Sequence, residues 1–354
     1  MDNLDKKLLT KIQFDFPLDL QPFNRLAGEL QSTEAEVINR LQQLRDQNVI
    51  RQISAIFDTR NLGYTSSLVA MRIPPELLSS SARKINEFPG VSHNYKRENF
   101  FNLWFTVAVP PGRDLNDTIR ILAFEANAET TLILPTMKLF KIGVKLDMTG
   151  ESNGLTEEGR QQFKRVRRPL SREEREIVKA LQRDLDLISR PFKPVAEKIG
   201  VPESEVFRIM KAFMEEGIMR RYAAVLHHRK AGFTHNGMGV WKVPEDRIEE
   251  LGWKMGSYRG VSHCYQRPTY PEWSYSLYTM VHGMSEADCE VIIQGISEAT
   301  GLKEFLILYS TVEYKKDRID YFSDNFDEWY AAHSIPAQYV PKNLRALESY
   351  AQVY

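Results

Sequence analysis

Apolar positions at the start of the chain recur with a helical period and then change to a short strand-like run. Residues 4–12 keep the spacing of an amphipathic helix. Pro22 opens a second short helix, and Ser32 or Thr33 caps a third helix that ends near Asn48. Residues 49–57 have the composition of a strand. This order predicts a helix-turn-helix followed by a wing.

The pattern changes in the next stretch of the chain, where short apolar runs alternate with helical periods. Strands are expected at residues 64–73, 91–96, 101–109 and 131–143, and helices at residues 76–88 and 115–127. The order βαββαβ predicts a ferredoxin-like sandwich.

The whole pattern occurs twice. The string Gly-Val-Ser-His-Asn-Tyr-Lys-Arg at residues 90–97 returns as Gly-Val-Ser-His-Cys-Tyr-Gln-Arg at residues 260–267. A period this long indicates a duplicated domain and not a solenoid repeat. We therefore expect an α+β fold of two tandem copies, each a winged helix-turn-helix plus a ferredoxin-like βαββαβ sandwich.

The duplication also sets the expected domain boundaries. These are helix-turn-helix regions at 1–60 and 171–230, ferredoxin-like sandwiches at 61–146 and 231–316, a linker at 147–170 and a C-terminal tail at 317–354. The tail is rich in aromatic residues between Tyr321 and Tyr330, which predicts that it packs across the other copy. Two copies in one chain predict an internal pseudo-dimer and leave a homodimer open.

Composition narrows the function classes. Lys plus Arg equals Asp plus Glu, 47 against 47, so the chain lacks the basic footprint of a dedicated nucleic-acid-binding protein. The N-terminus has no apolar signal core, and no apolar run would span a bilayer. Cys264 and Cys289 form no CxxC pair, which argues against a zinc site or a disulfide framework. We expect a cytoplasmic protein without a membrane partner.

Several strings resemble known families. Leu4-Asp5, Leu26-Ala27, Arg40-Leu41 and Val49-Ile50 resemble the Lrp/AsnC regulators. The strings at 93–97 and 102–106 resemble one subunit type of the siroheme decarboxylases, an enzymatic branch of that architecture. Those at 224–233, 240–244 and 264–268 resemble the other subunit type. The chain therefore looks like both subunit types fused head to tail.

The resemblance implies a carboxy-lyase that converts siroheme to 12,18-didecarboxysiroheme in heme d1 or alternative heme biosynthesis. Its partners would be siroheme and the decarboxylated products, and no separate cofactor is expected because the iron arrives with the substrate. Arginines would hold the carboxylates that stay, and a histidine would deliver a proton. Residues two apart on a strand share a face, so His93, Tyr95 and Arg97 point the same way.

The resemblance also implies the residues of the site. Expected catalytic residues are His93, His228 and His263, with no metal ligand set of the protein's own and a contact from His93 or His228 to the substrate iron. The expected substrate-binding residues are Tyr95, Arg97, Trp104, Arg220, Arg221, Arg229, Tyr265 and Arg267. A single His/Tyr/Arg face is ordinarily the wet side of an antiparallel sheet, but its recurrence favours a site. His282 is expected to begin a loop after a strand and is retained as an outside candidate.

Two alternatives stay open. One is an Lrp/AsnC-type DNA-binding regulator, and the other is a heme sensor without catalysis. The expected recognition helices begin with acidic residues around Glu34 and Glu203, which suit a helix N-terminus but repel phosphates. The sequence therefore favours the enzyme.

Overall fold

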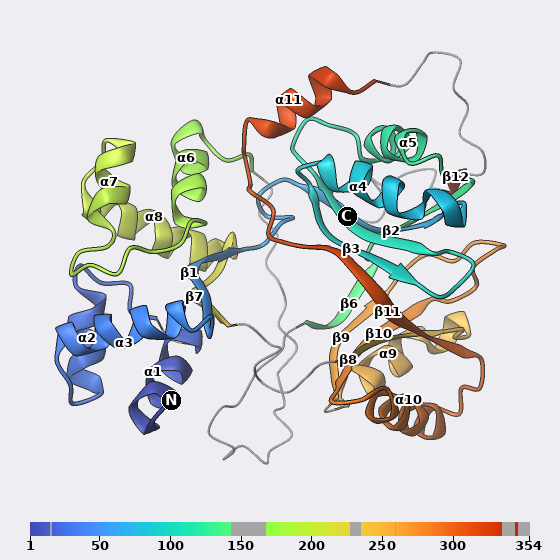
Figure 1. The fold of residues 1–354 in the computed structure, drawn as a ribbon, viewed down its shortest axis with the longest axis horizontal. Coiled ribbons are helices and arrows are strands. Elements are labelled where there is room, and N and C mark those ends of the chain that lie inside the picture. The colour runs from blue at the N-terminus through green and yellow to red at the C-terminus, as the bar shows by residue number, and fades with distance from the viewer. Residues whose placement is uncertain (15, 143–167, 227–234, 259, 335–343, 346–354) are drawn as a thin grey trace. The chain divides into compact units, whose positions relative to one another are not determined.

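The described residues form two compact units in a computed structural model of the chain (Figure 1). Description covers residues 1–14, 16–142, 168–226, 235–258, 260–334 and 344–345. One unit contains both helix-turn-helix regions, and the other contains both sandwiches. Domains of the same type therefore group together, although the two copies follow one another along the chain. Among the helices described, none is long and apolar enough to cross a membrane.

In the part of the helix-turn-helix unit that the structure describes there are six helices and one strand pair. The helices are α1 (Asn3–Phe14), α2 (Pro22–Glu29), α3 (Glu34–Asp46), α6 (Arg172–Leu181), α7 (Lys193–Ile199) and α8 (Glu203–Glu216). The Thr33 side chain accepts a hydrogen bond from the Glu36 amide at the start of α3, as its capping pattern predicts. The two expected wings, β1 (Ile50–Phe57) and β7 (Met219–Leu226), pair antiparallel with each other.

The sandwich unit is built on one continuous sheet. In the first copy its elements are β2 (Thr65–Arg72), α4 (Leu78–Glu87), β3 (Val91–Arg97), β4 (Leu103–Val109), α5 (Leu115–Glu125), β5 (Thr130–Leu134) and β6 (Lys138–Ile142). In the second they are β8 (His235–Trp241), α9 (Ile248–Gly256), β9 (Val261–Gln266), β10 (Leu277–Gly283), α10 (Glu286–Thr300) and β11 (Phe305–Lys316). Among the described residues the strand order is β12-β5-β2-β4-β3-β11-β8-β10-β9-β6, where β12 is Leu344–Arg345.

The last strand of each copy crosses into the sheet of the other. The expected strand at 131–143 is wrong as a single element, because it is split into β5 and β6 at Pro135. β5 pairs with β2 of its own copy, whereas β6 pairs with β9 of the second copy. β11 is unbroken, but its first half pairs with β8 and its second half with β3. The two sandwiches thus exchange edge strands reciprocally.

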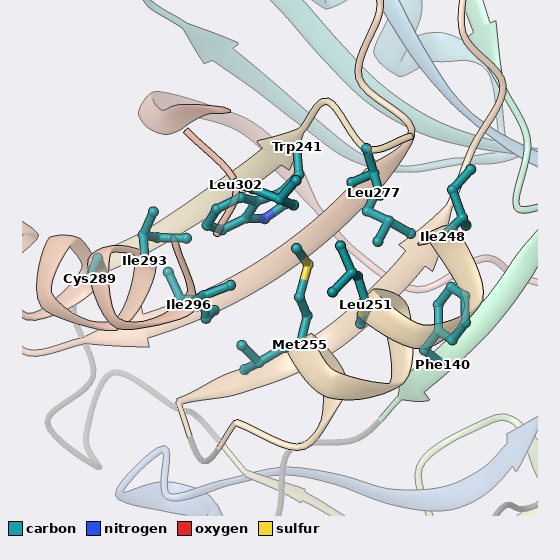
Figure 2. Packing of buried hydrophobic residues seen from close by; sticks show 14 residues of the cluster. Phe140, Trp241, Ile248, Leu251, Met255, Leu277, Cys289, Ile293, Ile296 and Leu302 are labelled. Atoms are coloured by element: carbon teal, nitrogen blue, oxygen red, sulfur yellow. The ribbon is translucent and has the colours of Figure 1, made fainter. Parts of the chain in front are cut away.

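The exchange carries core side chains with it. Phe140 of β6 packs among the buried residues beneath α9 and α10, close to Leu251 and Ile248 (Figure 2). A second buried cluster takes residues from both copies, including Trp104, Leu134, Met238 and Leu308. Burial of apolar surface stabilises a fold by roughly 25 cal/mol per Å². Because these cores contain residues from both copies, the burial stabilises the two sandwiches together.

The C-terminal segment packs across the first copy, in agreement with its aromatic composition. Helix α11 (Asn325–Ala332) places the rings of Phe326, Trp329 and Tyr330 against Phe88, with centroids 4.6–5.8 Å apart. The Tyr330 hydroxyl lies 2.8 Å from that of Thr118 in α5. Helix α11 therefore belongs to the sandwich unit and covers its helical side, whereas residues 320–323 belong to the helix-turn-helix unit.

Candidate functional site

The repeated string forms a bulged strand in both copies. In β3 the register against β4 shifts between Val91 and His93, so Ser92 is the extra residue. In β9 the register against β10 shifts in the same place, so Ser262 is the extra residue. A bulge re-aims the neighbouring side chains, and bulges are over-represented beside active sites. The shared Gly-Val-Ser-His pattern is therefore the sequence of a specific local backbone.

The bulge brings a histidine and a tyrosine together on one sheet face. The ring centroids of His93 and Tyr95 lie 6.2 Å apart, and those of His263 and Tyr265 lie 5.9 Å apart. All four rings are half-buried. Asn94, between the first pair, is buried and points the other way, because its amide donates to the Ala82 carbonyl of α4. Each His–Tyr pair thus lies on the face away from the helices.

Both arginines of the repeat reach across to the other copy. The Arg97 guanidinium donates to the Leu308 carbonyl of β11, and the Arg267 guanidinium donates to the Leu134 carbonyl of β5. Their carbons lie 5.9 Å and 5.0 Å from the ring centroids of Tyr95 and Tyr265. Both side chains are buried. The sequence analysis expected substrate carboxylates here, whereas the structure gives each arginine a backbone carbonyl at the strand exchange.

Arg97 keeps donor capacity after this contact. Its Nε has no hydrogen-bond partner among the described residues, and no carboxylate there forms an ion pair with it. Burial lowers the pKa of Arg97 to about 10, so the group still carries its charge at neutral pH. A buried cation without a counter-charge is costly, and an anionic ligand would remove that cost.

Trp104 lies deeper than a ligand-contacting residue. It is 1% exposed, its indole nitrogen donates to the Phe101 carbonyl at 2.6 Å, and its ring packs 5.4 Å from that of Trp273. It is the direct register partner of Tyr95, so it lies on the same face. It lies at the base of that face, within the core that both copies share.

The arginines expected on β7 belong to the helix-turn-helix unit. Arg220 forms an ion pair with Asp58, with 2.6 Å between Nη2 and Oδ2, so the carboxylate it holds is the protein's own. Arg221 follows directly at a bulge, where the register of β7 against β1 skips Arg220, and both arginines are exposed. His228 and Arg229 lie outside the described residues.

The second copy contains a hydrogen-bonded chain that the sequence analysis missed. His263 Nδ1 lies 2.8 Å from Ser262 Oγ, which lies 2.6 Å from His282 Nε2. His282 Nδ1 in turn lies 2.6 Å from Asn236 Oδ1. The expectation that His282 begins a loop is wrong, because it lies within β10. Only the strand register reveals the difference between the copies: β10 pairs His282 with Asn236, where β4 pairs Ala108 with Ser66.

In the first copy the corresponding chain is shorter. His93 Nδ1 lies 3.0 Å from Ser92 Oγ, which lies 2.8 Å from the Thr106 hydroxyl. Within the described ranges, no group of three or more His, Cys, Asp or Glu side chains could hold a metal ion. The site chemistry available there is imidazole, phenol, hydroxyl and guanidinium.

Family comparisons agree with the residue patterns. The AsnC-like ligand binding domain matches residues 61–141 and 230–315. The siroheme decarboxylase NirDL-like HTH domain matches residues 5–51 and 174–220. The expected fold class, two tandem copies of these two domain types, is confirmed.

Relatives that match the whole chain or one of its halves are siroheme decarboxylases. A siroheme decarboxylase from Hydrogenobacter thermophilus is 40% identical over 331 residues, covering 93% of this chain and 98% of the relative. A siroheme decarboxylase beta subunit from Methanosarcina barkeri is 41% identical over 140 residues, covering 40% of this chain and 92% of that subunit. The crystal structure of the siroheme decarboxylase NirDL with an iron-uroporphyrin III analogue has a TM-score of 0.76 and 35% identity, covering 93% of this chain and 98% of that one. The suspected resemblance is confirmed.

Proposed function

Since this chain belongs to the siroheme decarboxylase family, we propose that it removes acetate carboxyl groups of siroheme as carbon dioxide and leaves methyl groups. The observation that carries the proposal is the repeated His–Tyr pair beside a buried guanidinium. Siroheme is a flat ring rimmed with acetates and propionates, so it needs both a proton donor and cationic anchors. Both are present on the face of the sheet opposite the helices.

The reaction step requires one proton for each carboxylate lost. The bond between the acetate methylene and its carboxylate breaks, carbon dioxide leaves, and the electron pair stays with the macrocycle side. A protonated His93 or His263 then supplies the proton that completes the methyl group. Histidine suits this role because its ordinary pKa lies near neutrality. His228, also proposed to handle protons or face the iron, lies outside the described residues.

Anchoring falls to Arg97 and its aromatic surroundings. Its unpartnered Nε and buried charge suit a carboxylate that remains on the substrate. Tyr95, 5.9 Å from the guanidinium carbon, supplies a phenol at the same place. The fully buried Trp104 beneath it contributes a dry wall, and removal of water strengthens electrostatic contacts with the departing carboxylate.

The rival DNA-binding function is disfavoured by the candidate recognition helices. In α3, Arg40 is bound to Asp2 at 2.7 Å, Asp5 at 2.9 Å and Glu36 at 2.9 Å. In α8, Arg208 is bound to Glu205 of the same helix. Arginines held by carboxylates are not poised for phosphates, and the flanking acidic residues repel them. We therefore assign the helix-turn-helix regions a role in assembling the chain and not in binding DNA.

The finer assignments form part of the same proposal. The enzyme is a carboxy-lyase that needs no cofactor beyond the iron of its substrate, it acts in the cytoplasm, and its product serves heme d1 or alternative heme biosynthesis. The two copies act as an internal pseudo-dimer, and a homodimer of chains is compatible with that arrangement.

The test is an anaerobic incubation of the purified protein with siroheme, read by mass spectrometry. Loss of two carbon dioxide units supports the full proposal, and loss of one shows that a single face is active. An unchanged mass with a shifted absorption spectrum would indicate a sensor or carrier instead. The matched control is the His93→Ala, His263→Ala double variant, which retains both bulges and lacks both imidazoles.

A further inference from the structure

The second copy holds its repeat histidine through a chain of polar contacts across three adjacent strands. The chain runs from Asn236 on β8 to His282 on β10, and from there to Ser262 and His263 on β9. Each link is 2.6–2.8 Å long. Heavy-atom separations in this range are those of well-formed hydrogen bonds. The chain ends on the histidine that the duplication marks as functional.

The fold itself does not require this chain. β2 and β4 make the same pairing in the first copy, but the positions of Asn236 and His282 are there occupied by Ser66 and Ala108. The backbone is therefore stable without the imidazole and the amide. A pair of polar residues present in only one of two equivalent places calls for a reason other than folding.

The hydrogen bonds of this chain have a fixed donor-to-acceptor order, which Asn236 sets at the end far from His263. The Asn236 oxygen can only accept, so His282 Nδ1 carries the proton that it receives. Nε2 of the neutral His282 then accepts from the Ser262 hydroxyl, whose contact at 2.6 Å is shorter than its 3.2 Å contact to the Met280 carbonyl. The Ser262 oxygen is left to accept from His263 Nδ1. His263 is thereby held with its proton on Nδ1 and its basic lone pair on Nε2.

No such fixed order exists in the first copy. Ser92 and Thr106 are both hydroxyls, and either can donate to the other. His93 can therefore meet Ser92 as donor or as acceptor. The Ser92–Thr106 contact therefore does not itself select a tautomer of His93.

We propose that His282 and Asn236 are positioning residues that lock the tautomer of His263, so that this histidine releases and regains its catalytic proton at Nε2. The catalytic meaning rests on the proposed decarboxylation. The imidazolium of His263 gives its Nε2 proton to the methylene carbon as carbon dioxide leaves. The neutral imidazole that remains has its proton on Nδ1, which is the form that Ser262 and His282 stabilise. Loss of a hydrogen-bond partner that orients a functional histidine typically lowers activity 10–100-fold.

The first readout is independent of siroheme. In protein labelled with ¹⁵N at its 7 histidines, a two-bond proton–nitrogen spectrum reports which ring nitrogen of each carries the proton. His263 is expected as the Nδ1-protonated form, although histidine in water prefers protonation at Nε2. The His282→Phe variant, which keeps a ring and loses both nitrogens, should return His263 to the solution preference. An unchanged His263 tautomer in that variant would overturn the proposal.

Two further variants separate the relay from general damage. His282→Gln retains an acceptor for Ser262 and a donor for Asn236, so it should restore both the tautomer and most of the rate. Thr106→Val removes the hydroxyl that contacts Ser92 in the first copy and should leave the His263 tautomer unchanged. If His282→Gln behaves like His282→Phe, the hydrogen-bonded relay is not what His282 provides.

The kinetic readout completes the test. His282→Phe should lower kcat for siroheme on the order of 10–100-fold with little change in KM. A changed tautomer with an unchanged kcat would refute the positioning role. If the wild-type protein does not turn over siroheme, the proposed function fails, while the tautomer spectra still decide whether the relay exists.

Discussion

The two His–Tyr faces share their backbone and differ in what lies behind it. Both have the bulged serine, and the two His–Tyr ring separations differ by less than half an ångström. Behind His93 are two hydroxyls, whereas behind His263 are a hydroxyl, a second imidazole and an amide. The bulged backbone, which both copies share, is required by the fold. The hydrogen-bond partners behind each histidine differ, and in them the two copies differ chemically.

The surroundings of the two faces also differ in polarity. Across the exchanged strands, Tyr95 is opposite Glu313 of β11, whereas Tyr265 is opposite Leu139 of β6. Glu313 is exposed and charged, and Leu139 is half-buried and apolar. A drier setting raises the strength of each hydrogen bond within it. The second face therefore combines a directed relay with a less polar neighbour.

Removing both repeat histidines should have the largest effect. The His93→Ala, His263→Ala variant is expected to lose about 1,000-fold or more in turnover, because a general acid contributes 10²–10⁴-fold. His93→Ala alone should remove most of the turnover while the fold stays intact. Single-turnover mass spectrometry measures both, with circular dichroism as the folding control. Unchanged rates in the His93 variant would remove that residue from the mechanism.

The glycine before each bulge offers a comparison in stability. A Cβ at Gly90 would collide with the backbone carbonyl of Ala108, whereas a Cβ at Gly260 would meet only the Ile292 side chain. Gly90→Ala should therefore lower the free energy of unfolding by about 3 kcal/mol, and Gly260→Ala by about 1 kcal/mol, since a side chain can move aside. Urea unfolding of the two variants tests the order. Equal losses of unfolding free energy would mean that the backbone of β4 moves aside as easily as the Ile292 side chain.

The residue after each histidine gives a smaller contrast. Asn94 donates to the Ala82 carbonyl at 3.2 Å and to Asn86 Oδ1 at 2.9 Å, while Cys264 donates to the Gly252 carbonyl at 3.4 Å. Asn94→Ala should lower the free energy of unfolding by about 2 kcal/mol because it leaves buried acceptors unmet. Cys264→Ala should lower it by about 1 kcal/mol, since a thiol is a weak donor. Thermal unfolding compares the two, and the reverse order would contradict the burial argument.

The smallest effect is expected from alkylating reagents. Burial raises the pKa of Cys264 to about 12, so almost none of it is the reactive thiolate between pH 7 and 9. Iodoacetamide labelling of the folded protein at this position should be negligible and should rise only as the pH approaches that value. Peptide mass spectrometry gives the extent of labelling, with urea-unfolded protein as the positive control. Rapid labelling of folded protein at pH 8 would show that β9 opens.

Local elements followed from the sequence because their causes are local. Helix α3 begins at Glu34, directly after its Thr33 cap, and ends at Asp46, close to the expected end near Asn48. The His–Tyr–Arg face followed from the two-residue period of a strand. The strand exchange could not be predicted from the sequence. β6 and β11 have ordinary strand composition, and composition does not determine which strand each one pairs with. The His282 relay was missed for the same reason, since it joins residues on three strands.

The reciprocal exchange has a consequence for how the chain is made. The outer edge of β3 is completed by the second half of β11, about 200 residues further along. At the usual rate of synthesis of 5–20 residues per second, that edge stays open for roughly 10–40 s while the ribosome finishes the chain. An open strand edge is a template for pairing with other molecules. The nascent first half therefore depends on protection, or on slow collapse, until the last strand arrives to close it.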